Sequence, residues 1–163
     1  VATFGPGNRG NIHTLMDQIR RGRFVQIGAG NNRKSVAYVE NVAAFLKHAL
    51  NLPAGRHLYN YADKPDWRMA ELVRFLRGSF GLKRRGMRLP YSLGLAGGMV
   101  FDTLASVTGR RFPISAVRVR KFCADTVVNA GKLHAETGFT PPYTLEEGLQ
   151  AMIDSDFRDR DRV

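Results

Sequence analysis

Residues that favour β-strands occur in this chain only as a few short stretches, separated by longer helical patterns. Strands are predicted at 24–27, 35–39 and 57–61, with shorter extended segments at 1–4 and 87–90. Apolar residues at helical spacing predict helices at 12–21, 42–50, 68–77, 91–107, 116–122, 132–137 and 145–153. The alternation predicts an α/β or α+β domain, but the strands are too few for a complete doubly wound sheet.

Four of the predicted helices are preceded by a side chain that favours a helix N-terminus. A short polar side chain can accept a hydrogen bond from a backbone N–H that the helix leaves unpaired. The expected caps are Asn11, Asn41, Ser115 and Thr144. Acidic residues follow Thr144 in the first turn of the last helix, where the helix dipole favours them.

The length and cysteine content are those of an intracellular globular domain. The 163 residues are expected to form one domain over 1–157, followed by a charged, disordered tail at 158–163. The single cysteine, Cys123, excludes an internal disulfide and favours a reducing compartment. Since the first residues show no signal-peptide pattern, we expect a cytoplasmic protein.

The charge favours an anionic partner. A net charge of +11 suits a nucleic acid, a membrane surface or a phosphorylated small molecule. The basic residues are spread in small groups, and no helix-turn-helix, zinc-finger or aromatic-basic RNA-binding pattern accompanies them. A stand-alone basic nucleic-acid-binding module is therefore the less favoured alternative function. The four histidines show no metal-ligand spacing, so no metal is expected.

The most apolar stretch, 91–107, bears on whether a membrane is a partner. A spanning helix needs about 20 consecutive apolar residues. This stretch is shorter than that, and glycines and Asp102 interrupt it. We therefore expect a buried or half-buried helix here, and no membrane partner.

The opening Gly5-Pro-Gly7-Asn-Arg-Gly10 matches the glycine pattern of a dinucleotide-binding turn. That pattern is meaningful only between a buried strand and a helix, with an acidic residue about 20 positions further on for the ribose. The next predicted strand, 24–27, ends in Gly28-Ala-Gly30 and carries no acid, and Pro6 lacks an N–H for a pyrophosphate. These glycines are therefore not expected to hold a cofactor.

Five segments carry a resemblance that spans nearly the whole chain. They are Phe4-Gly-Pro-Gly-Asn-Arg-Gly-Asn-Ile12, Ile27-Gly-Ala-Gly-Asn-Asn-Arg-Lys-Ser-Val-Ala-Tyr-Val-Glu-Asn-Val-Ala43, Tyr59-Asn-Tyr-Ala-Asp63, Arg88-Leu-Pro90, and Lys132 through Gly138-Phe-Thr-Pro141 to Leu145-Glu-Glu-Gly-Leu149. Their order and spacing resemble the C-terminal half of an extended short-chain dehydrogenase/reductase of the NAD-dependent nucleotide-sugar epimerase/dehydratase family. The resemblance implies the helix-rich, substrate-binding portion of a Rossmann-type enzyme, without the main NAD-binding sheet.

The family's N-terminal half has no counterpart in these residues. That half holds the glycine-rich cofactor loop and a catalytic Tyr-x-x-x-Lys, and none of the five tyrosines here has Lys four positions later. The resemblance implies NAD or NADP in a parent epimerase, dehydratase or reductase, a nucleotide-diphosphate sugar as ligand, and no activity of this chain alone. An apolar surface left by the missing half would favour self-association. The sugar, the nucleotide and the reaction within the family stay open.

The resemblance also implies a set of substrate-binding residues. The loop at Gly7 and Asn11 would border the nucleotide-sugar cleft, with the cap of the following helix as the alternative role of Asn11. Lys34, with Arg33 beside it, aligns with a basic residue that faces the diphosphate; a surface pair beside a strand is the alternative.

Two further positions complete the expected site. Arg118 and Lys121 lie three apart on one helical face and could converge on an anion, whereas Arg120 lies on another face. A solvated basic helix is the alternative for this pair. Pro90 and Tyr91 are expected to line the base or sugar pocket, with simple packing as their alternative role.

Overall fold

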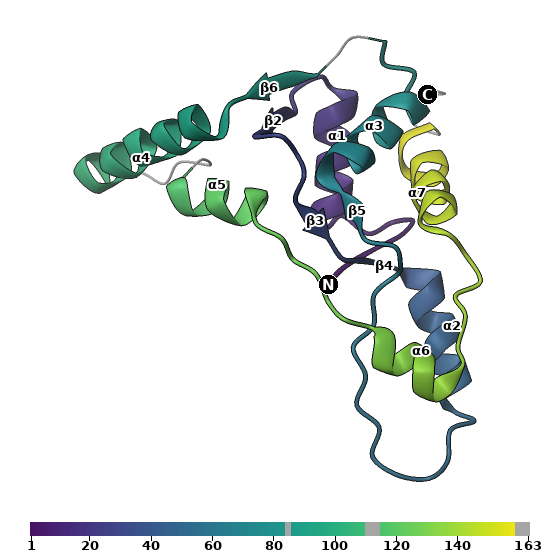
Figure 1. Ribbon diagram of the computed structural model, residues 1–163. Helices are drawn as coiled ribbons and strands as arrows, with labels where there is room; N and C mark the ends of the chain where they lie inside the picture. The colour runs from purple at the N-terminus through teal and green to yellow at the C-terminus, as the bar shows by residue number, and fades with distance from the viewer. Residues whose placement is uncertain (84–85, 110–114, 159–163) are drawn as a thin grey trace. The chain divides into compact units, whose positions relative to one another are not determined.

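The computed structural model describes residues 1–83, 86–109 and 115–158 (Figure 1). The strands are β1 (Ala2–Phe4), β2 (Val25–Ile27), β3 (Arg33–Lys34), β4 (Val36–Tyr38), β5 (Trp67–Arg68) and β6 (Met87–Leu89). The helices are α1 (Asn11–Arg20), α2 (Val39–Ala49), α3 (Met69–Ser79), α4 (Tyr91–Thr108), α5 (Ala116–Cys123), α6 (Gly131–Thr137), α7 (Leu145–Ile153) and the π-helix η1 (Asp154–Arg158). Helices with a few short strands are what the sequence predicts.

The contacts divide the chain into two compact units. The first consists of Val1–Asp17, Lys34–Trp67 and Thr126–Val163. The second consists of Gln18–Arg33 and Arg68–Asp125. At the end of the first unit, Arg158 closes η1 and pairs with Asp154 at 2.8 Å. The rest of the predicted tail, 159–163, lies outside the described residues.

The core of the first unit forms where α7 packs on a small parallel sheet. Strand β1 pairs with β4 in the register Ala2 to Val36, and the rings of Phe4 and Tyr38 lie 5.5 Å apart. A side-chain carbon at Gly148 of α7 would lie only 2.7 Å from the Tyr38 ring, so this glycine lets the helix approach the sheet. The apolar face of α7 is fully buried as a result, at Leu149, Met152 and Ile153.

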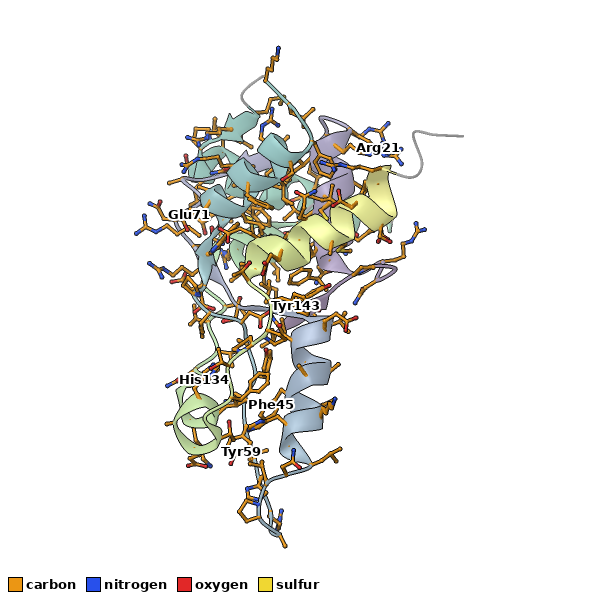
Figure 2. The ribbon with its side chains drawn as sticks, turned by 90° about the vertical axis from the view of Figure 1, so that its right-hand side faces the viewer. Arg21, Phe45, Tyr59, Glu71, His134 and Tyr143 are labelled. Atoms are coloured by element: carbon orange, nitrogen blue, oxygen red, sulfur yellow. The ribbon has the colours of Figure 1, made fainter. Side chains whose placement is uncertain are left out.

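A second cluster of the first unit joins α2 to α6. Phe45, Leu133 and Phe139 form it, and the rings of Tyr59 and Tyr61 lie 6.2 Å and 5.7 Å from the Phe45 ring. Figure 2 shows Phe45 and Tyr59 of this cluster. The strand predicted at 57–61 is wrong, because the structure has no strand at these residues. Their alternating tyrosines pack on α2 instead of forming one face of a sheet.

The second unit is built on the parallel pair β2 and β6, in the register Val25 to Met87. Helix α3 contributes its core residues, which are Met69, Leu72, Val73 and Leu76. Helices α4 and α5 pack against each other through Gly98, where a side-chain carbon would lie 2.7 Å from the Ala116 backbone. The Asp102 carboxylate accepts a hydrogen bond from the Ala116 N–H at 2.9 Å, which fixes the start of α5 against α4.

Two of the four predicted caps are confirmed. The hydroxyl of Ser115 accepts from the Arg118 N–H, and that of Thr144 accepts from the Glu147 N–H, each at 3.2 Å. The caps predicted at the other two positions are wrong. Helix α1 begins at Asn11 itself, and α2 begins at Val39, so that Asn41 lies inside its first turn.

Candidate functional site

A cleft of about 400 Å³ opens in the second unit beside the turn that follows β2. Residues 27–32 form one wall, and Tyr91, Arg120, Cys123 and Ala124 form the other. None of the described residues that line the cleft is acidic. Its volume lies within the range of small-molecule sites, which is roughly 300–1,000 Å³.

Two glycines give the first wall its shape. Gly28 and Gly30 have φ angles of 74° and 71°, in the left-handed region that glycine adopts without strain. The Gly30 carbonyl accepts from the Ala70 N–H and the Asn32 carbonyl from the Met69 N–H, both at 2.9 Å. The turn is therefore held rigidly at the start of α3.

The second wall is held against the first by α5. The Asn32 side-chain amide donates to the Phe122 carbonyl at 2.9 Å, and the rings of Phe24 and Phe122 lie 6.1 Å apart. This attachment places Arg120 at the cleft, and Tyr91, the first residue of α4, lies beside Gly28. A guanidinium can bind a phosphate or carboxylate through two parallel hydrogen bonds, and an aromatic ring offers a flat apolar face. The cleft thus suits an anionic ligand with a ring.

The structure brings Arg120 to the cleft, whereas three sequence-predicted residues of the same region lie around it. Arg118 and Lys121 are exposed on α5, and Pro90 is the exposed residue before α4. None of these three lines the cleft. Tyr91, the neighbour of Pro90, does.

The structure, rather than the sequence, shows why Arg120 is the basic residue of α5 at the cleft. Ala116 and Val119 are the buried positions of this helix, and they define the face that packs on the rest of the unit. Arg120 follows Ala116 by four residues and therefore lies on the same side of the helix. The sequence analysis chose Arg118 and Lys121 because their spacing of three places them on one face of the helix. That face does not line the cleft.

Arg33 and Lys34, the basic pair at the end of the glycine turn, make hydrogen bonds to different partners. The Arg33 backbone N–H donates to the Asp125 carboxylate at 2.7 Å, and its side chain is exposed. The Lys34 ammonium donates to the Thr126 hydroxyl at 3.2 Å in the first unit. Neither residue lines the cleft.

The glycine loop that opens the chain has a different environment. The Gly7 N–H donates to both carboxylate oxygens of Asp156, at 3.0 Å and 3.2 Å, and Asn11 is exposed at the start of α1. An acid thus occupies the position where a phosphate is expected and would repel it. A side chain at Gly5 would also overlap Val39. The loop as the structure has it does not fit a dinucleotide pyrophosphate.

A buried polar network in the first unit explains the position of Asn41. Its amide donates to the Asp63 carboxylate at 3.0 Å and to the Tyr143 carbonyl at 2.9 Å, and its carbonyl accepts from the Tyr143 N–H. The Tyr61 hydroxyl also donates to Asp63, at 2.9 Å. Burial, and then this bond to a negative carboxylate, raise the pKa of Tyr61 far above its usual range. These groups are structural ties rather than acids or bases.

Neither a metal site nor a spanning helix is found in the described residues. No group of three or more His, Cys, Asp or Glu side chains over 1–83, 86–109 and 115–158 could hold a metal ion. Over the same ranges, no helix is both long and apolar enough to cross a membrane.

Comparison with known proteins identifies relatives. No family model matches the chain. It is 47% identical over 155 residues to the N-acetyl-alpha-D-glucosaminyl-diphospho-ditrans,octacis-undecaprenol 4-epimerase of Escherichia coli O157:H7, covering 94% of this chain and 46% of the relative. It is 22% identical to the 2-alkyl-3-oxoalkanoate reductase of Stenotrophomonas maltophilia, covering 91% of this chain and 47% of the relative. The chain thus spans about half the length of the curated relatives it matches.

A solved structure gives the same result for the fold. The UDP-glucose 4-epimerase of Thermotoga maritima, solved with UDP-glucose, matches with a TM-score of 0.64 at 17% identity, over 98% of this chain and 44% of that one. The chain is a C-terminal half of an extended short-chain dehydrogenase/reductase of the nucleotide-sugar epimerase/dehydratase family.

Proposed function

We propose that the protein containing this chain is a sugar 4-epimerase whose substrate is an N-acetylhexosamine linked to a carrier through a diphosphate. This chain would supply the substrate-binding half. The observation that carries the proposal is the 47% identity to the E. coli 4-epimerase, which extends over 94% of the chain. An alignment of this length includes residues of both units.

The carrier of the diphosphate distinguishes two versions of this substrate. The E. coli relative acts on a diphosphate linked to undecaprenol, and the Thermotoga structure holds UDP-glucose. The diphosphate-linked sugar is common to both. Since the polyprenol-linked substrate belongs to the relative with far higher identity, we propose a polyprenyl diphosphate sugar as the substrate here.

The cleft offers groups suited to this ligand. Arg120 is placed to bind a phosphate oxygen, and the Tyr91 ring can pack on the apolar face of the sugar. The rigid turn at Gly28 and Gly30 would anchor the diphosphate end of the ligand while the sugar ring is free to turn, because inversion requires the hydride to return to the opposite face of the sugar. A cleft without an acidic residue also avoids repulsion of the diphosphate.

The redox chemistry would come from outside this chain. In the parent enzyme, a bound NAD or NADP would supply reversible hydride transfer. The glycine loop at 5–10 does not fit that cofactor, and no Tyr-x-x-x-Lys pair is present. The role of this chain is therefore to bind and orient the sugar and its diphosphate, and the isolated chain would be inactive.

The test is conversion of defined substrates by the full-length protein. It would be incubated with NAD and either N-acetylglucosaminyl-diphospho-polyprenol or UDP-N-acetylglucosamine, and the released sugars separated by chromatography. We expect N-acetylgalactosamine from the lipid-linked substrate. Conversion of the UDP-sugar alone would transfer the proposal to a nucleotide carrier, and conversion of neither would refute it.

A further inference from the structure

A second cavity of the second unit lies on the other face of the β2–β6 pair from the cleft. Gln26 and Ile27 are neighbours in β2, so their side chains point to opposite faces of the pair. Ile27 lines the cleft, whereas Gln26 lines the second cavity, whose volume is about 590 Å³. No described residue lines both. The second cavity is therefore separate from the cleft, and it is large enough for a small molecule.

Helix α3 and strand β6 bring basic side chains to this second cavity. Arg88 of β6 pairs with Gln26 in the parallel register and therefore projects from the same face. Arg74 and Arg77 of α3 are three residues apart and lie on one side of that helix. Lys83, from the segment between α3 and β6, completes the set. Four cationic side chains thus line what we call the basic cavity.

The charge of the basic cavity is not balanced by its own lining. None of the described residues that line it is acidic. Arg74, Lys83 and Arg88 are exposed. The Arg77 guanidinium lies against Gly86, where an added side-chain carbon would be 3.2 Å from its Nη1. Like charges gathered around a cavity repel one another and concentrate a positive potential in it, and a bound anion relieves that repulsion. The lining thus favours a ligand with several negative charges.

The lining also contains a buried hydrogen-bond donor. Gln26 is 4% exposed, and its Nε2 has no hydrogen-bond partner in the part of the chain that the structure describes. The amide lies beside the glycine turn and the start of α3, because a side-chain carbon at Gly30 would overlap Nε2 and lie 3.1 Å from the Ala70 Cβ. A buried donor without an acceptor is costly, so a ligand that brings an acceptor oxygen to this amide is favoured.

We propose that the basic cavity is a second anion site, which binds a phosphate-bearing molecule with two or more negative charges. Guanidinium groups bind phosphate oxygens through paired, charge-assisted hydrogen bonds, and an ammonium group adds a point charge. The site goes beyond the proposed function, because the diphosphate of the sugar substrate is assigned to Arg120 in the cleft. A nucleic-acid strand fits less well, because sites for single strands combine a basic groove with aromatic rings, and none of the described lining residues is aromatic.

The proposal gives the basic composition of the chain a location. The net charge of +11 predicts an anionic partner without placing it, because the basic residues are spread in small groups. Arg74 and Arg88 belong to no common group in the sequence. The pairing of β6 with β2 brings them to one cavity.

The experiment is isothermal titration of the full-length protein with inorganic pyrophosphate in the presence of saturating NAD. Every protein carries Arg120→Ala, so that the cleft contributes little to binding. The test variant adds Arg74→Gln/Arg88→Gln. The matched control adds Arg21→Gln/Arg23→Gln, which removes the same charge from exposed residues of the same unit that line neither the cleft nor the basic cavity. We expect at least about tenfold weaker binding in the test variant, and a change of less than about twofold in the control.

A second arm distinguishes the two sources of a phosphate group, a free small molecule and a lipid headgroup. The same variants are floated with vesicles of phosphatidylglycerol. Binding of pyrophosphate without flotation supports a free phosphate compound as the ligand. Flotation that weakens at least about tenfold in the test variant alone supports a headgroup in the same cavity.

Three results would overturn the basic cavity as a separate anion site. In the first, Arg120→Ala alone abolishes binding of pyrophosphate, which would assign the anion to the cleft. In the second, the control loses as much affinity as the test variant, so that binding follows net charge rather than location. In the third, the protein binds neither pyrophosphate nor the vesicles. None of these measurements uses epimerase activity, so a failure of the proposed function would leave their outcome unchanged.

Discussion

Helices α7 and α4 are both rich in apolar residues, yet they use them in opposite ways. In α7, Leu149, Met152 and Ile153 are fully buried in the core of the first unit. In α4, the large residues Leu93, Val100 and Leu104 are exposed, and glycines occupy the packed face.

The comparison teaches that glycine position, rather than apolar content, decides which face of a helix is buried. Gly148 of α7 admits the Tyr38 ring, and the large residues around it follow into the core. Ile27 approaches α4 at Gly94, and the α5 backbone approaches it at Gly98. Both come so close that a larger side chain would not fit at either position. Leu93, Val100 and Leu104 of α4 are then left exposed.

The largest expected effect is loss of core packing in α7. Leu149→Ala should reduce the free energy of unfolding by about 2–5 kcal/mol, because it leaves a cavity at a fully buried position. Leu104→Ala in α4 should change it by less than about 0.5 kcal/mol. Urea unfolding of both variants checks the comparison, and equal losses would mean that α4 is buried in the protein in solution.

A smaller effect is expected at the glycines of α4. Gly98→Ala should cost about 1–3 kcal/mol of unfolding free energy, because the added carbon would lie 2.7 Å from the Ala116 backbone, which cannot easily move. Gly97→Ala is the matched control, since nothing lies within 4 Å of its added carbon. The control should gain about 0.5–1 kcal/mol from helix propensity. Thermal unfolding of the two variants measures both effects. If both substitutions raised the unfolding temperature, the close contact of α4 with α5 would be contradicted.

Helix α5 allows a similar comparison between Arg120, an exposed residue that lines the cleft, and two exposed basic residues that do not. Arg120→Ala should weaken binding of the diphosphate-linked sugar about tenfold, which corresponds to about 1.4 kcal/mol. Arg118→Ala and Lys121→Ala, which change exposed residues of the same helix, should each weaken it less than about threefold. Isothermal titration with a soluble analogue measures all three. A larger loss at Arg118 or Lys121 would favour the pair predicted from the sequence.

Features that depend on neighbours in the sequence were predictable, and those that depend on distant partners were not. The Ser115 and Thr144 caps need only the backbone three residues later, and both are confirmed. Asn41 has the same cap preference, but its partners Asp63 and Tyr143 are 22 and 102 residues away. The alternation at 57–61 likewise gave a false strand, because its tyrosines pack on Phe45 of another segment.

The candidate site follows the same rule. The glycine turn after β2 could be located from the sequence, since its glycines and its neighbours carry the family resemblance. The choice of Arg120 over Arg118 could not, because the contact of Gly98 with Ala116 decides which side of α5 faces inward. The exposed apolar face of α4 was missed for a similar reason: its apolar residues predicted burial, and only the packed glycines show which face is covered.

The smallest expected effect concerns the start of α7, which is capped, in contrast to α4, where Pro90 provides no side-chain cap. The Thr144 N–H and hydroxyl donate to the Glu147 carboxylate at 2.7 Å and 2.9 Å, and these two bonds hold the pKa of Glu147 below its usual value. Thr144→Ala should cost about 1 kcal/mol at neutral pH. A carboxyl with a lowered pKa in the folded state stabilises the protein above its unfolded-state pKa, and this contribution is lost as the pH falls through the folded-state value.

Glu147→Gln is the variant that isolates this titration. The wild type should be more stable than the variant at pH 7, and the difference should shrink as the pH falls below the ordinary glutamate value of 4.5. Urea unfolding at both ends of this range measures it, and Glu146→Gln, an acid of the same first turn without a bond to Thr144 in the capping box, serves as the control. A difference that stayed constant with pH would mean that the amide replaces the carboxylate fully, and that α7 owes its fixed start to the burial of Leu149 and its neighbours alone.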